Sequence, residues 1–188
     1  MRVLSAGVVG SLSVLVLLCV AAIRASGGTG SPAAGVPDTP GELRPPGDQE
    51  LVLEAHARGV QIYACSSGQD HSGHFEWTFK GPEAELFDRN DRKIGKHYGG
   101  PTWESTDGST VVGEVKARDD GPDPMAIPWL LLTAKSNSGA GVLSNVKSIQ
   151  RVRTVGGKAP SSPCGSDNEQ QVFRVPYKAV YYFYAPKR

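Results

Sequence analysis

The stretch "ELVLEAHARGVQIYAC", residues 50–65, decides the fold class because its apolar residues recur at every second position. Leu51, Leu53 and Ala55 share one face of an extended chain, and the alternation resumes in "GVQIYAC", residues 59–65. In that second run one face carries Val60, Ile62 and Ala64, and the other carries Gln61, Tyr63 and Cys65. A period of two is the spacing of a β-strand that buries one face.

Runs of the same kind continue to the C-terminus, each rich in β-branched or aromatic residues. They are "FEWTFK" (75–80), "AELFD" (84–88), "KIGKHY" (93–98), "TVVGEVKAR" (110–118), "VKSIQRVRTV" (146–155), "QVFRV" (171–175) and "YKAVYYFY" (177–184). Turn-forming residues separate several of them, as in "DRNDR", "TDGS" and "GGKAPSSP". The apolar stretch "AIPWLLLTAK" (126–135) fits a short helix or a buried strand, and we favour a central strand. We therefore predict a single all-β domain, an antiparallel β-sandwich or barrel of about 8–10 short strands.

The N-terminus has the pattern of a secretory signal peptide. Arg2 precedes an apolar run from Val8 to Ile23, and small residues follow around Ala25. We predict that residues 1–25 are cleaved and that the protein is secreted or held in the cell envelope. An uncleaved membrane anchor is the alternative, because the run is nearly long enough to span a bilayer.

Residues 26–47 are rich in Gly, Pro and Ser, and they are predicted to form a flexible leader before a β domain at 48–188. The whole chain has 20 basic and 19 acidic residues. Removing residues 1–25 takes away Arg2 and Arg24, which leaves 20 − 2 = 18 basic against 19 acidic residues. Because charges of both signs are interspersed, the sequence gives no electrostatic basis for nucleic-acid binding.

The same cleavage leaves two cysteines, Cys65 and Cys164. In an oxidising compartment an even pair is first interpreted as a disulfide. A cysteine nucleophile is the alternative, but it needs a free thiolate that export would tend to oxidise.

The stretch "HYGGPTWESTDGS", residues 97–109, is the most crowded candidate site. A hydrolase hypothesis takes His97 as general acid or base, with Glu104 and Arg151 positioning it or stabilising charge. For a binding function, the candidates are Tyr98, Trp103, Gln150 and Arg151. A structural role, in which His97 and Arg151 only satisfy buried hydrogen bonds, is the third hypothesis.

Aromatic residues offer a possible platform for saccharides, since flat rings with polar edges stack on sugars. The set comprises Trp77, Trp103, Trp129, Tyr98 and the C-terminal "YYFY" at 181–184. Most of these rings are expected in the core. In the C-terminal run Tyr182 and Tyr184 alternate with Tyr181 and Phe183, so only one pair faces the core and the other is either covered or exposed.

Two further motifs give weak signals. His71 and His74 in "DHSGH" offer two ligands for a metal ion, but no third ligand lies close in the sequence. The segment "NSGAGVLS", residues 137–144, lacks the third glycine of a dinucleotide-binding loop and is interpreted as a strand connection. No cofactor is expected.

The phrases "ARGVQIYAC", "FEWTFKGPEAELFD", "GKHYGGPTWESTDGSTVVGEV", "IPWLLLTAKS", "GVLSNVKSIQRVRTVGGKAP" and "PYKAVYYFYAP" together resemble the domain of unknown function 3455 family. The resemblance covers about residues 48–186. It implies an exported protein and names no catalytic residue. Its pattern includes Gln61, Tyr63, His97, Trp103, Gln150 and Arg151.

From these observations we expect a secreted, non-enzymatic binding protein, with an extracellular polysaccharide or cell-wall component as partner. A secreted hydrolase and a purely structural protein are the alternatives.

Overall fold

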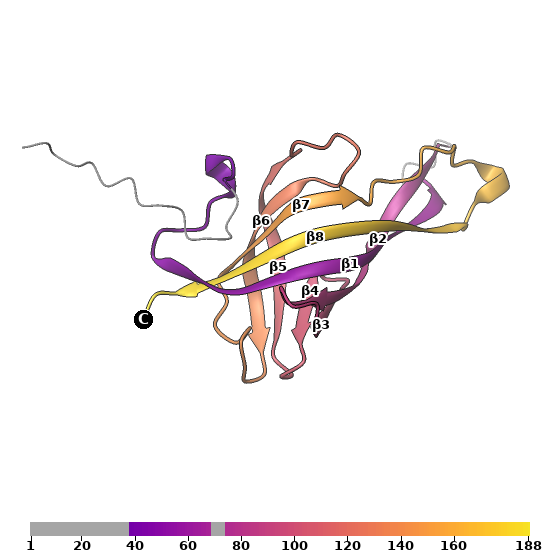
Figure 1. Cartoon of the computed structure of the whole chain (residues 1–188). Coiled ribbons are helices and arrows are strands. Elements are labelled where there is room, and N and C mark those ends of the chain that lie inside the picture. Colours follow the sequence, from indigo (N-terminus) through magenta and orange to yellow (C-terminus); the bar gives the residue numbers. More distant parts are fainter. Residues whose placement is uncertain (1–37, 69–73) are drawn as a thin grey trace, which may run out of the picture. The chain divides into compact units, whose positions relative to one another are not determined.

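The computed structural model describes residues 38–68 and 74–188, and in them eight antiparallel strands close into a barrel. The strands are β1 (Gln49–Ser67), β2 (Phe75–Phe87), β3 (Lys93–Tyr98), β4 (Thr102–Ser105), β5 (Thr110–Asp119), β6 (Trp129–Ser138), β7 (Ser148–Gly156) and β8 (Val172–Pro186). Each strand pairs with the next along the chain, and β8 pairs with β1 to close the barrel (Figure 1). The all-β, antiparallel prediction is confirmed. The apolar stretch at 126–135 is a strand from Trp129 onward, as favoured above.

Several strands are longer than predicted. The runs "ELVLEAHA" and "GVQIYAC" form one strand, β1, because Arg58 and Gly59 stay paired with β2 and β8 instead of turning. The runs "FEWTFK" and "AELFD" are likewise one strand, β2. A register shift opposite Ile62 leaves Lys80 as an extra residue in β2. Such a bulge beside Gly81 and Pro82 lets a proline remain inside a strand.

The two faces of β8 separate two clusters of apolar side chains. Tyr181 and Phe183 point into the barrel, where they pack with Trp103 and with apolar side chains of the other strands. Tyr182 and Tyr184 point outward and pack with Val152 and Val180, partly buried Leu51 and Trp129 beside them. The second pair is therefore covered and does not form an exposed patch.

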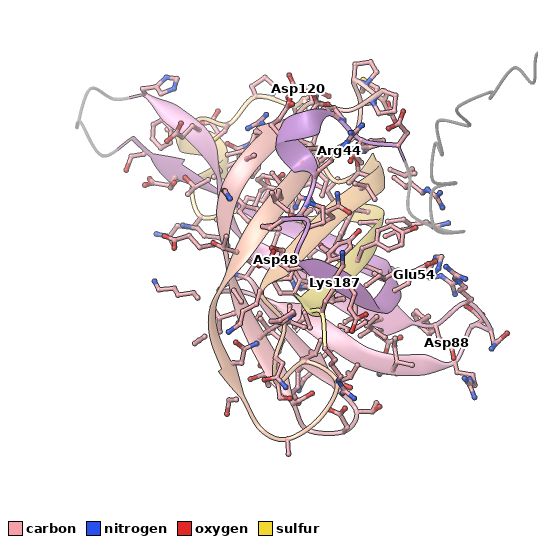
Figure 2. The ribbon with its side chains drawn as sticks, turned by 90° about the vertical axis from the view of Figure 1, so that its left-hand side faces the viewer. Arg44, Asp48, Glu54, Asp88, Asp120 and Lys187 are labelled. Carbon is pink, nitrogen blue, oxygen red and sulfur yellow. A yellow bond between two sulfur atoms is a disulfide. The ribbon has the colours of Figure 1, made fainter. Side chains whose placement is uncertain are left out.

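A short segment before β1 helps to cover the outer cluster. It contains a 3₁₀ helix, η1 (Gly41–Leu43), and Figure 2 shows this turn beside Arg44 on the outer side of the sheet. The Leu43 side chain is fully buried, and its carbonyl accepts a hydrogen bond of 2.6 Å from Gln150 Nε2. The Tyr184 hydroxyl donates to Gln150 Oε1 at 2.6 Å, so Gln150 joins the segment to β8.

This segment corrects the predicted leader. Residues 38–47 were assigned to a flexible stretch, but the structure packs Thr39 and Leu43 against the barrel. The composition of the stretch did not predict this packing, because a single buried leucine and one backbone carbonyl are enough to hold the segment on the barrel. The predicted signal peptide and the rest of the leader lie outside the described residues.

A disulfide joins Cys65 and Cys164, with their Cα atoms 5.5 Å apart, as predicted. It links the end of β1 to the connection that leads through a second 3₁₀ helix, η2 (Ser166–Asn168), into β8. At this end of the barrel β1, β2 and β8 extend beyond the other strands, on the right of Figure 1. Within the described ranges, no helix has the length and apolar character needed to cross a membrane.

Candidate functional site

The barrel interior is not fully filled by side chains. A cavity of about 520 Å³ remains, and all eight strands contribute residues to its lining. Its apolar wall is formed by Phe79, Pro82, Val115, Ile127, Leu130 and Leu132. Phe79 and Val115 are about half exposed (49% and 53%), which places them where the cavity meets solvent.

Two buried polar groups in the lining, Gln61 Nε2 and Trp103 Nε1, have no hydrogen-bond partner among the described residues, and both side chains are at most 2% exposed. The Tyr181 hydroxyl is buried beside the Tyr177 hydroxyl and Arg151, but neither contact has ordinary hydrogen-bond geometry. The hydroxyl of Tyr177, a neighbour of Tyr181, is also buried without a hydrogen-bond partner of ordinary geometry. Since buried polar groups in proteins are nearly always bonded, this concentration in one cavity is unusual.

Arg151 on β7 brings a positive charge to the same cavity. Its Nε and Nη2 atoms donate to the Pro128 carbonyl at 3.1 and 2.9 Å, which fixes the guanidinium against the start of β6. Burial raises the pKa values of Tyr63 and Tyr181, and the nearby Arg151 charge opposes part of this rise. Among the residues that the structure describes, no carboxylate forms an ion pair with Arg151.

His97 lies deep in the lining and is 3% exposed. Its Nδ1–H donates to the Thr102 carbonyl at 2.8 Å, and its ring stacks on Trp103 with centroids 4.4 Å apart. Burial lowers the pKa of His97 to about 3; the Arg151 charge adds to this, while the Thr102 hydrogen bond opposes it. The imidazole is therefore neutral at ordinary pH, with Nδ1 protonated and Nε2 as an acceptor.

The buried position of Trp103 depends on a glycine of the next strand. A Cβ atom at Gly113 of β5 would stand 2.9 Å from the Trp103 ring and 3.2 Å from Leu132. Glycine therefore lets the indole lie against β5, facing inward beside His97 and Tyr181. Because Trp103 is 1% exposed, it cannot serve as a surface platform for a polysaccharide.

Basic residues also lie where the cavity opens. Lys80 and Arg118 belong to the lining and are exposed, and Arg118 pairs with Asp120. The lining contains no Asp or Glu within the ranges that the structure describes. On the outer surface, by contrast, acids and bases alternate and pair, as with Glu54 and Arg89 (Figure 2 labels Glu54).

The structure does not assemble the proposed His97, Glu104 and Arg151 site. Along β4 successive side chains alternate, so Trp103 points inward and Glu104 points outward. Glu104 accepts a hydrogen bond from the Tyr98 hydroxyl at 3.0 Å and pairs with Lys96 at 3.2 Å, and these contacts lower its pKa. The expectation of one three-residue site is corrected on this point: only His97 and Arg151 share the cavity.

The structure also places the four binding candidates on two different faces of the sheet. Trp103 and Arg151 line the cavity, whereas Tyr98 lies on the outer face with Lys96 over its ring at 5.5 Å. Gln150 neighbours Arg151 in sequence but faces the outer cluster. The alternation of side chains along β7 is the reason: consecutive residues of a strand cannot face the same side.

The histidine pair of "DHSGH" is not placed, because His71 lies outside the described residues. In the described ranges no three His, Cys, Asp or Glu side chains gather as a metal site would require.

Sequence reasoning did not select several residues of the cavity. Gln61 and Pro128 were not site candidates, although both lie in the resemblance to the family, and Tyr181 was named only within the aromatic set at 181–184. The available signal was the polar face of "GVQIYAC", which turns out to face inward. A polar face on a strand is normally expected to face solvent, and only the closed barrel shows that it lines a cavity.

Comparison with known proteins gives one match. A protein-family model described as "Protein of unknown function (DUF3455)" matches residues 45–185, which is most of the chain. No curated protein and no solved structure matches the chain.

Proposed function

The chain belongs to the DUF3455 family of proteins of unknown function, and on this premise we propose that it is a non-enzymatic protein that holds one small organic molecule inside its barrel. The position of the cavity supports this proposal. Eight-stranded barrels have an interior that is either filled by side chains or holds one small ligand. At about 520 Å³, this cavity has the size of a small-molecule site, which spans roughly 300–1,000 Å³.

The observation that carries the proposal is the set of unpartnered polar groups in an otherwise apolar cavity. Leaving a buried donor unsatisfied costs about 1–3 kcal/mol. Gln61 and Trp103 therefore carry a combined cost that a ligand with an apolar body and a few hydrogen-bond acceptors would offset when it displaces the side chains that enclose these two donors. Side chains of this kind, few and placed among apolar ones, are what fix the orientation of a bound small molecule.

The state of His97 supports binding over hydrolysis. A general base works best with a pKa near the working pH, whereas the pKa of His97 is about 3. Its Nδ1 donates to a backbone carbonyl, and the carboxylate proposed as its partner faces outward.

A neutral fluorescent probe tests the proposal. N-phenyl-1-naphthylamine becomes strongly fluorescent in apolar surroundings, and we expect saturable binding with one probe per chain. Leu130→Trp, which fills cavity space, and Val115→Trp, at the exposed mouth, should each weaken binding about tenfold or more. Val155→Trp adds the same indole at an equally exposed valine outside the lining and should leave binding unchanged. No saturable binding, or equal binding by all variants, would overturn the proposal.

We further propose that the protein works outside the cytoplasm. The disulfide supports this, because such bonds form and persist in oxidising compartments. A polysaccharide or cell-wall component stays a predicted partner for the outer surface, without Trp103 as its platform. Retention on insoluble polysaccharide would test it, and unbound protein in the wash would count against it.

A further inference from the structure

The hydrogen-bonding character of the cavity indicates the class of ligand. This inference rests on the proposed function. We propose that the ligand is an organic acid with a flat apolar body, and that its carboxylate binds Arg151.

The first argument is the state of Arg151. A guanidinium carries five N–H donors, and the two hydrogen bonds to Pro128 leave three others, which have only the neutral Tyr181 hydroxyl beside them. No carboxylate in the described ranges pairs with it. A positive charge that is partly removed from water is stabilised by an anion, and the planar fork of arginine matches the two oxygens of a carboxylate.

The second argument is that the unpartnered groups are donors. Trp103 Nε1 and Gln61 Nε2 can only donate, and the Tyr181 hydroxyl beside Arg151 can donate as well as accept. An anionic oxygen accepts from several donors at once. A ligand rich in N–H groups would find few acceptors here, and a cation would be repelled by Arg151. The donors therefore select for an acceptor-rich, negatively charged group.

The third argument is the charge of the lining as a whole. Lys80 and Arg118 stand at the mouth, where Arg118 pairs with Asp120 outside the lining, Arg151 lies inside, and the lining itself contains no acidic residue in the described ranges. A cavity lined by one sign of charge with apolar walls raises the local concentration of ions of opposite sign. The apolar wall, with Phe79 at the mouth and the stacked His97 and Trp103 rings inside, fits the body of the acid.

The test compares an acid with its neutral analogue. 2-Naphthoate and 2-naphthamide share one ring system and differ in the carboxylate, and each is titrated against bound N-phenyl-1-naphthylamine. In the wild-type protein we expect naphthoate to displace the probe at least tenfold more effectively than naphthamide. Added salt should weaken the binding of naphthoate and leave the binding of naphthamide unchanged, because only naphthoate binding depends on charge.

Substitutions then locate the charge that matters. Arg151→Gln should abolish the preference for naphthoate while naphthamide binds as before. Arg153→Gln is the matched control: it removes an equal charge from an exposed residue of β7 outside the lining, and the preference should persist. Arg151→Lys keeps the positive charge but not the planar fork, so it should retain only part of the preference for naphthoate. If Arg151→Gln does not fold, the loss of preference in Arg151→Lys is the test, and an unchanged preference would contradict the inference.

The outcomes separate this inference from the proposed function. If the neutral probe binds but wild-type protein treats the acid and the amide alike, the organic-acid inference fails and the binding function stands. If the preference survives Arg151→Gln, the anion lies elsewhere and the inference again fails. If no probe binds, both fail.

Discussion

His97 shows how much a single buried position alters the chemistry of a side chain. Its ring is enclosed by Trp103 and Tyr181, and burial lowers its pKa from about 6.5 in the unfolded chain to about 3 in the folded one. Between these two values the unfolded chain binds one proton more than the folded chain. The free energy of unfolding therefore falls as the pH falls from about 6.5 to about 3, by up to about 1.4 kcal/mol per pH unit.

His97→Asn should remove this pH dependence, because the amide N–H can still donate to the Thr102 carbonyl but does not titrate. The variant should be less stable at pH 7, since it loses the stacked ring. Its stability should nevertheless fall less steeply with acid than that of the wild type. Urea unfolding at several pH values from 7 to 4 measures both slopes.

The comparison of slopes isolates His97 from other groups that respond to acid. Asp107, whose pKa is lowered to about 2 by hydrogen bonds from Ser109 and Val142, loses its contribution below about pH 4 in both proteins. Parallel slopes for the wild type and His97→Asn above that pH would contradict a neutral, buried imidazole.

At the scale of the elements, the outer face of the sheet is completed by a segment that is not a strand. The turn η1 buries Leu43 over the outer side, and its carbonyl accepts the hydrogen bond from Gln150. Without this segment, the buried Gln150 amide would lose its acceptor, and the hydrogen-bonded link through Gln150 to the Tyr184 hydroxyl would be broken. The segment is therefore packed as part of the domain.

Leu43→Ala should lower the free energy of unfolding by about 2–4 kcal/mol, the usual cost of truncating a fully buried leucine. Val52→Ala, at a residue that is 37% exposed, should cost less than about 1 kcal/mol and serves as the control. Urea unfolding followed by tyrosine and tryptophan fluorescence gives both values. Equal, small losses would mean that the segment does not contribute to stability.

The elements also show what the sequence could predict. Alternating side chains located the strands, because a period of two is a local property of the chain. The join of "ELVLEAHA" to "GVQIYAC" was not predictable, since Arg58 and Gly59 resemble a turn until two neighbouring strands pair with them. The inward face was not predictable either. Tyr63 and Gln61 are buried while Ile62 is only half-buried, because the cavity accepts polar groups.

At the scale of the whole molecule, the Cys65–Cys164 disulfide encloses most of the barrel, because its two cysteines are 99 positions apart in sequence. In the chain-entropy model a loop of that length stabilises the folded state by up to about 4.7 kcal/mol. The bond also holds the projecting ends of β1 and β8 to the connection that contains η2.

The double variant Cys65→Ser/Cys164→Ser should lose about 2–5 kcal/mol of unfolding free energy. Wild-type protein treated with dithiothreitol should shift to the same value, and the double variant should not respond to the reductant. Chemical unfolding with and without reductant makes both comparisons. A double variant as stable as the oxidised wild type would show that the bond does not stabilise the fold.

The candidate site was predictable only in part, because it is a property of the closed barrel. His97, Trp103 and Arg151 were selected for their chemistry, and the cavity brings them together. Glu104 and Gln150 were selected for their nearness in sequence, and strand alternation turns them to the outside. Tyr181 was missed because the run "YYFY" alone does not show which pair faces inward.

The pairing of β1 with β8 also limits when the barrel can close during synthesis of the chain. The first and last strands lie side by side, and the Lys187 amide donates to the Asp48 carbonyl at 2.9 Å, where Figure 2 labels both residues. A chain emerging from the ribosome therefore has no partner for one edge of β1 until β8, at Val172–Pro186, has been made. Until then β1 and β7 both present open edges, which are templates for aggregation. The barrel can therefore close only after β8 has been made, and a truncated chain that lacks β8 would be an aggregation hazard and not a smaller version of the fold.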